Sequence, residues 1–290
     1  MWIYSIKIMK KFININGELL DLSTPIVMGI LNVTPDSFYS GSRKQSEKEI
    51  IERAGQILNE GAGIIDIGGQ STAPSSPFHS AKEELDRVVP ALQLIRKEFP
   101  DAILSIDTFY SEVVKRVVEK YGVNIINDIS GGQIDDNMFE TVAQLNVPYI
   151  LMHMRGTPQT MQQFTNYDNF IQNILYYFSE KISKLNLLGV NDIIIDPGFG
   201  FSKTIDQNYR LMAYLKYFDT FDVPILAGIS RKTMIYKLLG CTAEESLNGT
   251  SVLNTFALLS GAHILRVHDV KEAVECVKIV ERIKQSEHEQ

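Results

Sequence analysis

Short apolar segments recur along the whole 290-residue chain, and each is followed by a segment in which apolar residues have helical spacing. The apolar segments are rich in Ile and Val and do not alternate with polar residues, which is typical of strands buried on both faces of a parallel sheet. We predict eight such strands: Ile26–Leu31, Ile64–Ile67, Ile103–Ile106, Asn124–Asn127, Pro148–Met152, Asp192–Ile195, Pro224–Gly228 and His263–Val267.

Helix start and stop signals stand between these segments. Gly122 and Gly261 follow helical segments as stop signals. Three helix starts carry the pattern of a capping box, with Ser or Asp followed three residues later by Glu: Ser46 with Glu49, Ser80 with Glu83, and Asp269 with Glu272.

Eight strands that alternate with helices, without a long linker, predict the α/β class and one closed TIM (β/α)8 barrel. An open doubly wound sheet is the alternative, but the strand count and the polar residues at every strand end favour the barrel. Apolar residues before Asn16-Gly17 predict a short N-terminal β-hairpin at the barrel bottom. We therefore expect a hairpin extension at residues 1–22 and a single catalytic domain at residues 23–290.

The composition narrows the range of functions. The net charge is -7 and no basic block is present, which argues against nucleic acid as a partner. No apolar run is long enough to span a membrane, and lysines interrupt the N-terminal segment, unlike in a signal peptide. Cys241 and Cys276 lie far apart without a CxxC motif, so we expect reduced thiols in a cytoplasmic protein.

Polar residues follow every predicted strand, at the barrel end where active sites of this fold lie. Asp107, Asn127 and Asp196 suit a nitrogen heterocycle with N–H donors, because carboxylates accept hydrogen bonds and an amide both donates and accepts. The last two strands end in groups that suit a phosphate: Lys232, Arg266 and His268.

Asn32 follows the first strand, where an oxygen ligand and a pyrophosphate can share Mg²⁺. Each residue taken alone has a structural interpretation as well. Arg266, for example, could simply form an ion pair with Asp269.

The set of motifs resembles one family, the dihydropteroate synthases, over roughly residues 25 to 280. The motifs occur in the family's order at eight successive strand ends: Asn32-Val33-Thr34-Pro35-Asp36-Ser37-Phe38, Asp66-Ile67-Gly68-Gly69, Ser105-Ile106-Asp107-Thr108, Asn127-Asp128, Leu151-Met152-His153-Met154, Asp196-Pro197-Gly198-Phe199-Gly200-Phe201, Ser230-Arg231-Lys232 and Arg266-Val267-His268-Asp269.

The resemblance implies a transferase of folate biosynthesis. It would condense 6-hydroxymethyl-7,8-dihydropterin pyrophosphate with p-aminobenzoate to give 7,8-dihydropteroate and pyrophosphate. It also implies Mg²⁺ as cofactor, a homodimer and a sulfonamide target. The implied pterin ligands are Asp107, Asn127, Met152, Asp196 and Lys232, and the implied pyrophosphate ligands are Asn32, Arg266 and His268, with Asn32 near the metal. The implied p-aminobenzoate pocket consists of Phe38, Thr72, Phe201 and Ser230. The implied catalytic groups are Asp107, Lys232, Arg266 and His268.

Two loops depart from the family pattern. The second loop normally reads Ser-Thr-Arg-Pro-Gly, whereas this chain has Ala73 in place of the arginine. The first loop has Tyr39-Ser40-Gly41-Ser42 in place of Asp-Gly-Gly, with Arg43 just beyond. Ala73 motivates an alternative, a non-catalytic paralogue that binds pterin. The shared pterin carboxylates motivate another, a pterin-dependent methyltransferase of the corrinoid type.

Overall fold

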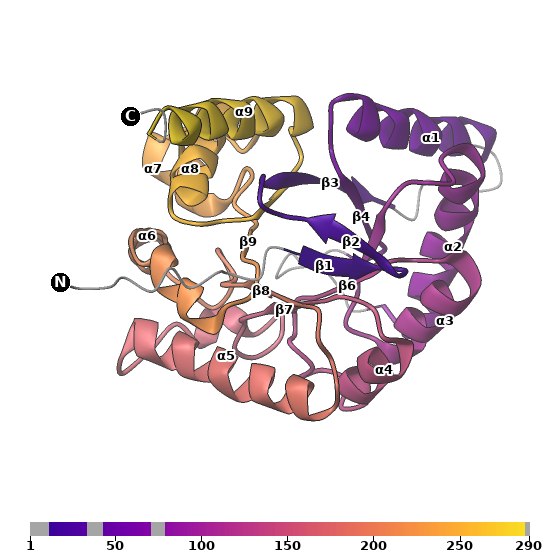
Figure 1. Ribbon diagram of the computed structural model, residues 1–290, viewed down its shortest axis with the longest axis horizontal. Helices are drawn as coiled ribbons and strands as arrows, with labels where there is room; N and C mark the ends of the chain where they lie inside the picture. Colours follow the sequence, from indigo (N-terminus) through magenta and orange to yellow (C-terminus); the bar gives the residue numbers. More distant parts are fainter. Residues whose placement is uncertain (1–11, 34–42, 71–78, 288–290) are drawn as a thin grey trace.

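Eight parallel strands surround a common centre, with helices on the outside (Figure 1). The computed structural model describes residues 12–33, 43–70 and 79–287. The sheet order is β8-β7-β6-β5-β4-β3-β10-β9. Its strands are β3 (Ile26–Asn32), β4 (Ile64–Gly68), β5 (Leu104–Asp107), β6 (Ile125–Asp128), β7 (Tyr149–Met152), β8 (Ile193–Asp196), β9 (Leu226–Ala227) and β10 (Ile264–Val267).

The ends of this sheet meet and close the barrel. Ile195 of β8 forms a parallel bridge with Ile225, and its N–H donates to the Pro224 carbonyl at 2.9 Å. The closed barrel is therefore confirmed and the open doubly wound sheet is wrong. All eight predicted strands are present. The largest difference is β9, which has two residues instead of the predicted Pro224–Gly228, consistent with proline lacking an N–H for the ladder.

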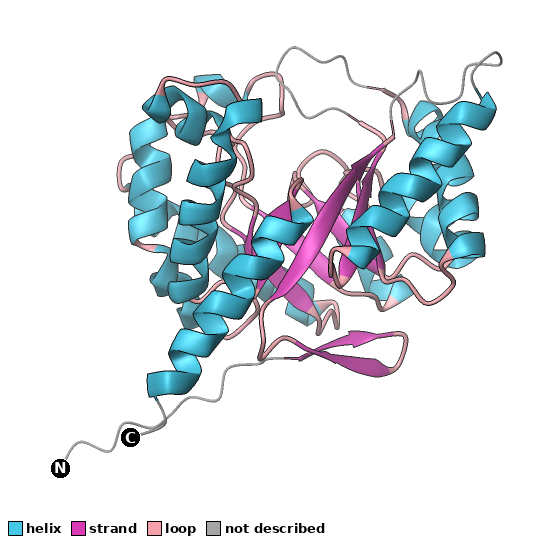
Figure 2. Ribbon diagram, turned by 90° about the horizontal axis from the view of Figure 1, so that it is seen from above, coloured by secondary structure: helices cyan, strands magenta, loops and turns pink. Residues whose placement is uncertain are grey.

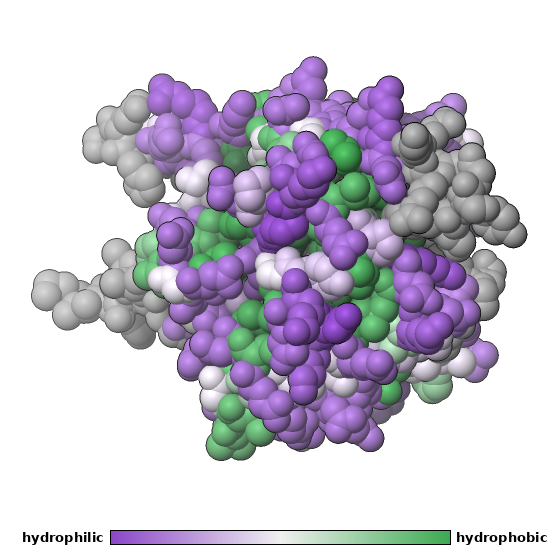
Figure 3. Space-filling model, turned by 90° about the vertical axis from the view of Figure 1, so that its right-hand side faces the viewer, coloured by the Kyte–Doolittle hydropathy of each residue, from purple (hydrophilic) through white to green (hydrophobic). Residues whose placement is uncertain are grey.

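The outer layer consists of helices that follow the strands. Short 3-10 helices complete the loops: η2 (Met161–Gln163), η3 (Leu215–Phe221) and η4 (Glu244–Ser246). The α-helices are α1 (Arg43–Asn59), α2 (Ala81–Glu98), α3 (Ser111–Tyr121), α4 (Met138–Leu145), α5 (Phe170–Leu187), α6 (Ile205–Ala213), α7 (Thr233–Leu239), α8 (Leu247–Leu259) and α9 (Val270–Glu287). Hydrophilic side chains predominate on the side where α2, α3 and α4 lie (Figure 3). Within the described residues, no helix is both long and apolar enough to cross a membrane.

An antiparallel hairpin, β1 (Phe12–Ile15) and β2 (Glu18–Asp21), covers the N-terminal end of the barrel strands (Figure 2). Asn16 and Gly17 both have positive φ, 53° and 93°, which is the backbone of a tight primed turn. The predicted hairpin is thus confirmed. Its apolar side chains pack against the first inward residues of the strands, forming one buried cluster: Ile13, Ile15, Leu22, Met28, Ile64, Ile125, Ile150, Ile194, Leu226 and Ile264.

The predicted helix signals have mixed outcomes. Ser80 and Glu83 form a complete capping box at α2, and Gly122 ends α3 in the left-handed conformation, as predicted. The predicted start at Ser46 is wrong, because α1 already begins at Arg43. Arg, Lys and Gln before Ser46 are good helix formers, so the helix extends past the polar residue that was expected to cap it.

Candidate active site

The alternation of side chains along the strands builds the site. Residues two apart in a strand point to the same side. In the barrel strands, each inward residue of the buried cluster beside the hairpin is therefore followed, two positions later, by an inward residue nearer the C-terminal end of the strand. We call the position of these second residues the upper level of the barrel. In four strands that residue is polar: Asp66 after Ile64, Asn127 after Ile125, Asp196 after Ile194, and Arg266 after Ile264. The intervening residues, such as Ile65 and Leu265, belong to the core between sheet and helices.

Arg266 lies at the centre of this polar level, bound between two carboxylates. Its Nε donates to Asp66 Oδ2 at 2.6 Å, and its Nη2 donates to Asp107 Oδ2 at 2.6 Å. Asp66 is fully buried and the Arg266 side chain is 20% exposed. The ion pair with Asp269 that the sequence allowed is wrong. The carboxylate of Asp269 instead binds Arg231, with distances of 2.8 and 2.9 Å.

The residues predicted for the heterocycle lie near Arg266 or its partner Asp66. Asn127 is buried and donates through Nδ2 to Asp66 Oδ2 at 3.1 Å. Asp196 is also buried, and its Oδ1 accepts a hydrogen bond from the Gly198 N–H at 2.8 Å. Met152 belongs to an apolar cluster with Phe109, Ile129, Met154 and Met161, against which Phe201 packs. Because Met152 pairs with Asp196 in the sheet, this apolar cluster lies next to a polar acceptor.

Lys232 lies between the residues predicted for the heterocycle and the loop after β8. Its Nζ donates to the Phe199 carbonyl and lies 4.6 Å from the centre of the Phe201 ring. Burial lowers the pKa of Lys232 to about 8, and the negative charge of Asp196 opposes that effect. Burial also raises the pKa of Asp196, against the nearby positive charge of Lys232. The buried Asp196 and the partly buried Lys232 thus each oppose the effect of burial on the pKa of the other.

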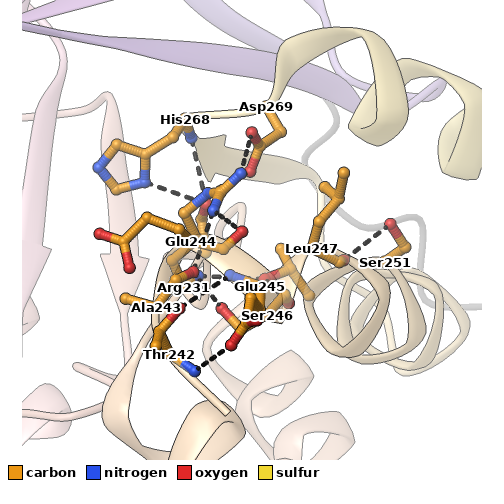
Figure 4. A network of polar contacts seen from close by, with 12 residues as sticks. Arg231, Thr242, Ala243, Glu244, Glu245, Ser246, Leu247, Ser251, His268 and Asp269 are labelled. Carbon is orange, nitrogen blue, oxygen red and sulfur yellow. Dashed lines mark hydrogen bonds and ion pairs between the residues drawn. The ribbon is translucent and has the colours of Figure 1, made fainter.

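His268 follows the last strand and lies near Arg231 and Asp269 (Figure 4). The Ser230 hydroxyl lies 3.1 Å from His268 Nδ1 and accepts the His268 backbone N–H at 3.2 Å. Arg231 anchors the same corner, because it donates to the Ala243 and Glu244 carbonyls as well as to Asp269. Burial and the positive charge of Arg266 lower the pKa of His268.

Asn32 ends β3 at the mouth of the barrel and is exposed. A side chain at Gly68 would come within 3.3 Å of Asn32 Oδ1 and 4.0 Å of Asp107 Oδ2. Glycine at this position therefore leaves open the space between these two acceptors. Phe38 and Thr72, predicted for the p-aminobenzoate pocket, lie outside the described residues, as does Ala73.

The contacts of two buried residues near this site, Asp66 and Lys203, were missed from the sequence. Asp66 was recognised only as part of a strand-end motif, not as the partner of Arg266 and Asn127. The buried Lys203 donates to His153 Nδ1 at 3.0 Å and to the carbonyls of Gly198 and Phe201, both at 2.9 Å. His153 and Lys203 are fifty positions apart, and no local sequence signal predicts that contact.

Known proteins are similar to this chain in sequence and in fold. The family described as "Pterin binding enzyme" matches residues 28–268. Dihydropteroate synthase of Escherichia coli strain K12 is 43% identical over 267 residues, which cover 91% of this chain and 94% of the relative. The crystal structure of the Yersinia pestis dihydropteroate synthase with a sulfonamide drug complex has a TM-score of 0.87 and 40% identity, covering 95% of this chain and 99% of that one.

A third similar protein is the Xanthomonas albilineans dihydropteroate synthase, solved with 4-aminobenzoic acid. Its TM-score is 0.85 and its identity 34%, with 94% of this chain and 98% of that chain covered. Together with the barrel and its polar rim, these likenesses establish that the chain belongs to the pterin-binding enzymes and, among them, to the dihydropteroate synthases.

Proposed function

We propose that this chain condenses 6-hydroxymethyl-7,8-dihydropterin pyrophosphate with p-aminobenzoate, releasing pyrophosphate and forming 7,8-dihydropteroate for folate synthesis. The observation that carries the proposal is the position of the Arg266 guanidinium. It binds Asp107 directly and lies near Asp196, and its partner Asp66 binds Asn127. A cation lies next to acceptors for a heterocycle, so one ligand with a heterocyclic end and an anionic end fits this polar level. Residues 23–290 act as the single catalytic domain, extended by the hairpin segment 1–22, and the enzyme works in the cytoplasm.

We propose the roles that the resemblance to the family implies, and the chemistry of each group suits its role. Asp107, Asn127 and Asp196 accept hydrogen bonds from the pterin, Lys232 donates to it, and Met152 packs against its ring. Arg266 and His268 bind the pyrophosphate and stabilise its growing charge as the bond to the pterin breaks. The negative charge of Asp107 stabilises the positive charge that develops on the pterin. Ser230, Phe201, Phe38 and Thr72 border the p-aminobenzoate, whose amine then attacks the pterin carbon.

One assay tests the reaction and separates the alternatives. Pyrophosphate release from the pterin pyrophosphate is measured with and without p-aminobenzoate, together with dihydropteroate formation. We expect both products in equal amounts when p-aminobenzoate is present. A paralogue that only binds pterin would release no pyrophosphate. A corrinoid methyltransferase would instead transfer a methyl group from methyltetrahydrofolate to cobalamin.

We expect Mg²⁺ to bind weakly to the protein alone and much more tightly with pyrophosphate. Within the described residues, no group of three or more His, Cys, Asp or Glu side chains is arranged to hold a metal ion. Asn32 offers one amide oxygen, whereas Asp66 and Asp107 face Arg266. These residues suit an ion that shares its ligands with phosphates and neutralises their charge. Calorimetry of Mg²⁺ with and without pyrophosphate measures the difference, and tight binding to the free protein would contradict it.

The rate is expected to depend on pH through Asp107 and Lys232. Burial raises the pKa of Asp107 to about 7 against the opposing charge of Arg266, and burial lowers that of Lys232 to about 8. A carboxylate that must be charged loses function as the pH falls, and an ammonium loses function as the pH rises. The pH profile of kcat/KM should therefore decline below about 7 and above about 8. An acidic limb near 3.8, the ordinary value for Asp, would contradict the role of Asp107.

We propose that the enzyme is a homodimer that buries the outer face of α7, α8 and α9, which lie next to one another (Figure 1). Several large apolar side chains are about half exposed or more on these helices: Leu238, Leu239, Val252, Phe256, Leu259, Ile279 and Ile283. In the proposed dimer these side chains form one apolar patch, and a contiguous patch is typical of a protein–protein interface. We expect Phe256→Lys to shift the sedimentation coefficient from dimer to monomer. The same change at exposed Tyr176 on α5 is the control and should leave the dimer intact.

A further inference from the structure

Asp66 contacts a residue from each half of the proposed site. It is fully buried on β4. Its Oδ2 accepts hydrogen bonds from Arg266 Nε at 2.6 Å and from Asn127 Nδ2 at 3.1 Å. Arg266 lies on β10 and Asn127 on β6. One carboxylate oxygen thus links the group proposed for pyrophosphate to a group proposed for the pterin.

The contact with Asp66 fixes which atoms of Arg266 remain available. Nε is directed at Asp66 and Nη2 at Asp107. A guanidinium is a rigid planar fork, so two bonds along its edge determine its orientation. Among the described residues, Nη1 has no hydrogen-bond partner. Its two N–H groups are therefore donors that Arg266 can offer to a ligand.

The same contact fixes the amide of Asn127. An ionised carboxylate only accepts hydrogen bonds, so the atom of Asn127 that faces Asp66 must be the nitrogen. The amide oxygen is thereby left as the free acceptor. A ring N–H or an exocyclic amine can bind that oxygen, whereas a flipped amide would present a donor in its place.

Resting on the proposed function, we infer that Asp66 is a positioning residue of this enzyme. It orients the Arg266 guanidinium towards the leaving pyrophosphate and presents the Asn127 oxygen to the pterin, without itself contacting either substrate. Its charge also has a consequence at Asp107. The negative charge of Asp66 is one of the causes that raise the pKa of Asp107, after burial and against Arg266.

Asp66→Asn tests the inference. The new amide offers Arg266 a neutral acceptor and can donate to Asn127, which lets that amide flip. We expect kcat for pyrophosphate release to fall about 100-fold and the Kd for 6-hydroxymethyl-7,8-dihydropterin to rise about tenfold, since a charged hydrogen bond becomes a neutral one. The acidic limb of the pH profile should also move to lower pH, because one negative charge beside Asp107 is removed.

Asp66→Glu keeps the charge but displaces the oxygen by one methylene. We expect kcat to fall while the acidic limb stays near its wild-type position. This variant carries the test if Asp66→Asn does not fold. Ser105→Ala is the matched control, because Ser105 is fully buried on β5 directly opposite Asp66 and its hydroxyl has no partner among the described residues. It should leave kcat, Kd and the pH profile unchanged.

The outcomes separate this inference from the proposed function. If the wild-type protein releases no pyrophosphate, the proposed function is overturned. The role of Asp66 can then still be tested by calorimetry, which measures the Kd for pterin as a function of pH in the wild type and in Asp66→Asn. If Asp66→Asn has wild-type kcat, Kd and acidic limb, the positioning role is wrong. A lower melting temperature with an unmoved limb and unchanged turnover per folded molecule likewise overturns it in favour of a purely structural role.

Discussion

Replacement of Arg266 by Ala is expected to lower kcat for pyrophosphate release by about 100-fold to 1000-fold, the usual loss when one preorganised donor to a developing anion is removed. The Nη1 donors of Arg266 have no protein partner among the described residues, so they are available to the pyrophosphate. Such contacts strengthen as the bond breaks, so the loss should appear in kcat and not only in KM. Steady-state kinetics with the pterin pyrophosphate measures it.

The same variant should also be less stable. Asp66 and Asp107 would face one another in the barrel without the cation between them, and breaking a buried ion pair from one side costs about 3–5 kcal/mol. Turnover must therefore be expressed per folded molecule, with the melting temperature measured in parallel. Affinity for the unphosphorylated pterin should fall much less than kcat/KM for the pyrophosphate.

An arginine at the opposite end of the barrel provides the control. Arg96 donates to the carbonyls of Pro100, Ala102, Tyr121 and Gly122 and to the amide oxygen of Asn124. Arg96→Met should lower the melting temperature and leave turnover per folded molecule nearly intact. If Arg266→Ala behaves in the same way, Arg266 only stabilises the fold and the catalytic role is refuted.

Asp196→Asn is expected to raise the Kd for pterin by about tenfold to 100-fold, because a hydrogen bond to a charged group contributes about 1.5–3 kcal/mol. One oxygen of Asp196 is engaged by the Gly198 N–H, and the other lies on the side of Gly228, where no side chain fills the space. We expect that second oxygen to accept a hydrogen bond from the heterocycle. An amide at this position presents a donor or a weaker acceptor to the same ligand. Calorimetry with 6-hydroxymethyl-7,8-dihydropterin measures the effect.

Asp192 supplies the matched control for this variant. It lies just before the same strand, at the barrel bottom, where its Oδ1 accepts the backbone N–H of Asn14 in the hairpin. Asp192→Asn should weaken the attachment of the hairpin and leave the Kd for pterin unchanged. An unchanged Kd in Asp196→Asn as well would remove Asp196 from the pterin site.

Much of the fold was predictable because its determinants are local. Apolar segments such as Ile64–Ile67 define strands, and Asn16-Gly17 specifies the hairpin turn, since both residues tolerate positive φ. The gathering of Asp107, Asn127 and Asp196 was also predictable. In a barrel the carboxyl ends of all strands lie on one rim, so residues that end separate strands must lie near one another.

The tertiary structure decided which of those groups bind one another. Arg266 and Asp269 are close in sequence, yet Arg266 points into the barrel from β10, whereas Asp269 follows the strand and meets Arg231. Asp66 reaches Arg266 because the inward residues of β4 and β10 stand at the same upper level of a closed barrel. The two residues are 200 positions apart.

The sequence therefore determined the barrel, the hairpin and the rim on which the polar residues gather, because strand periodicity and turn conformation depend on neighbouring residues. It did not determine the partners of Asp66, Lys203 or Arg231. Those contacts depend on strand register and on the direction of long side chains across the barrel, and neither is encoded within a few neighbouring positions. Only the closed barrel brings Arg266 between Asp66 and Asp107 and leaves its remaining donors for a ligand.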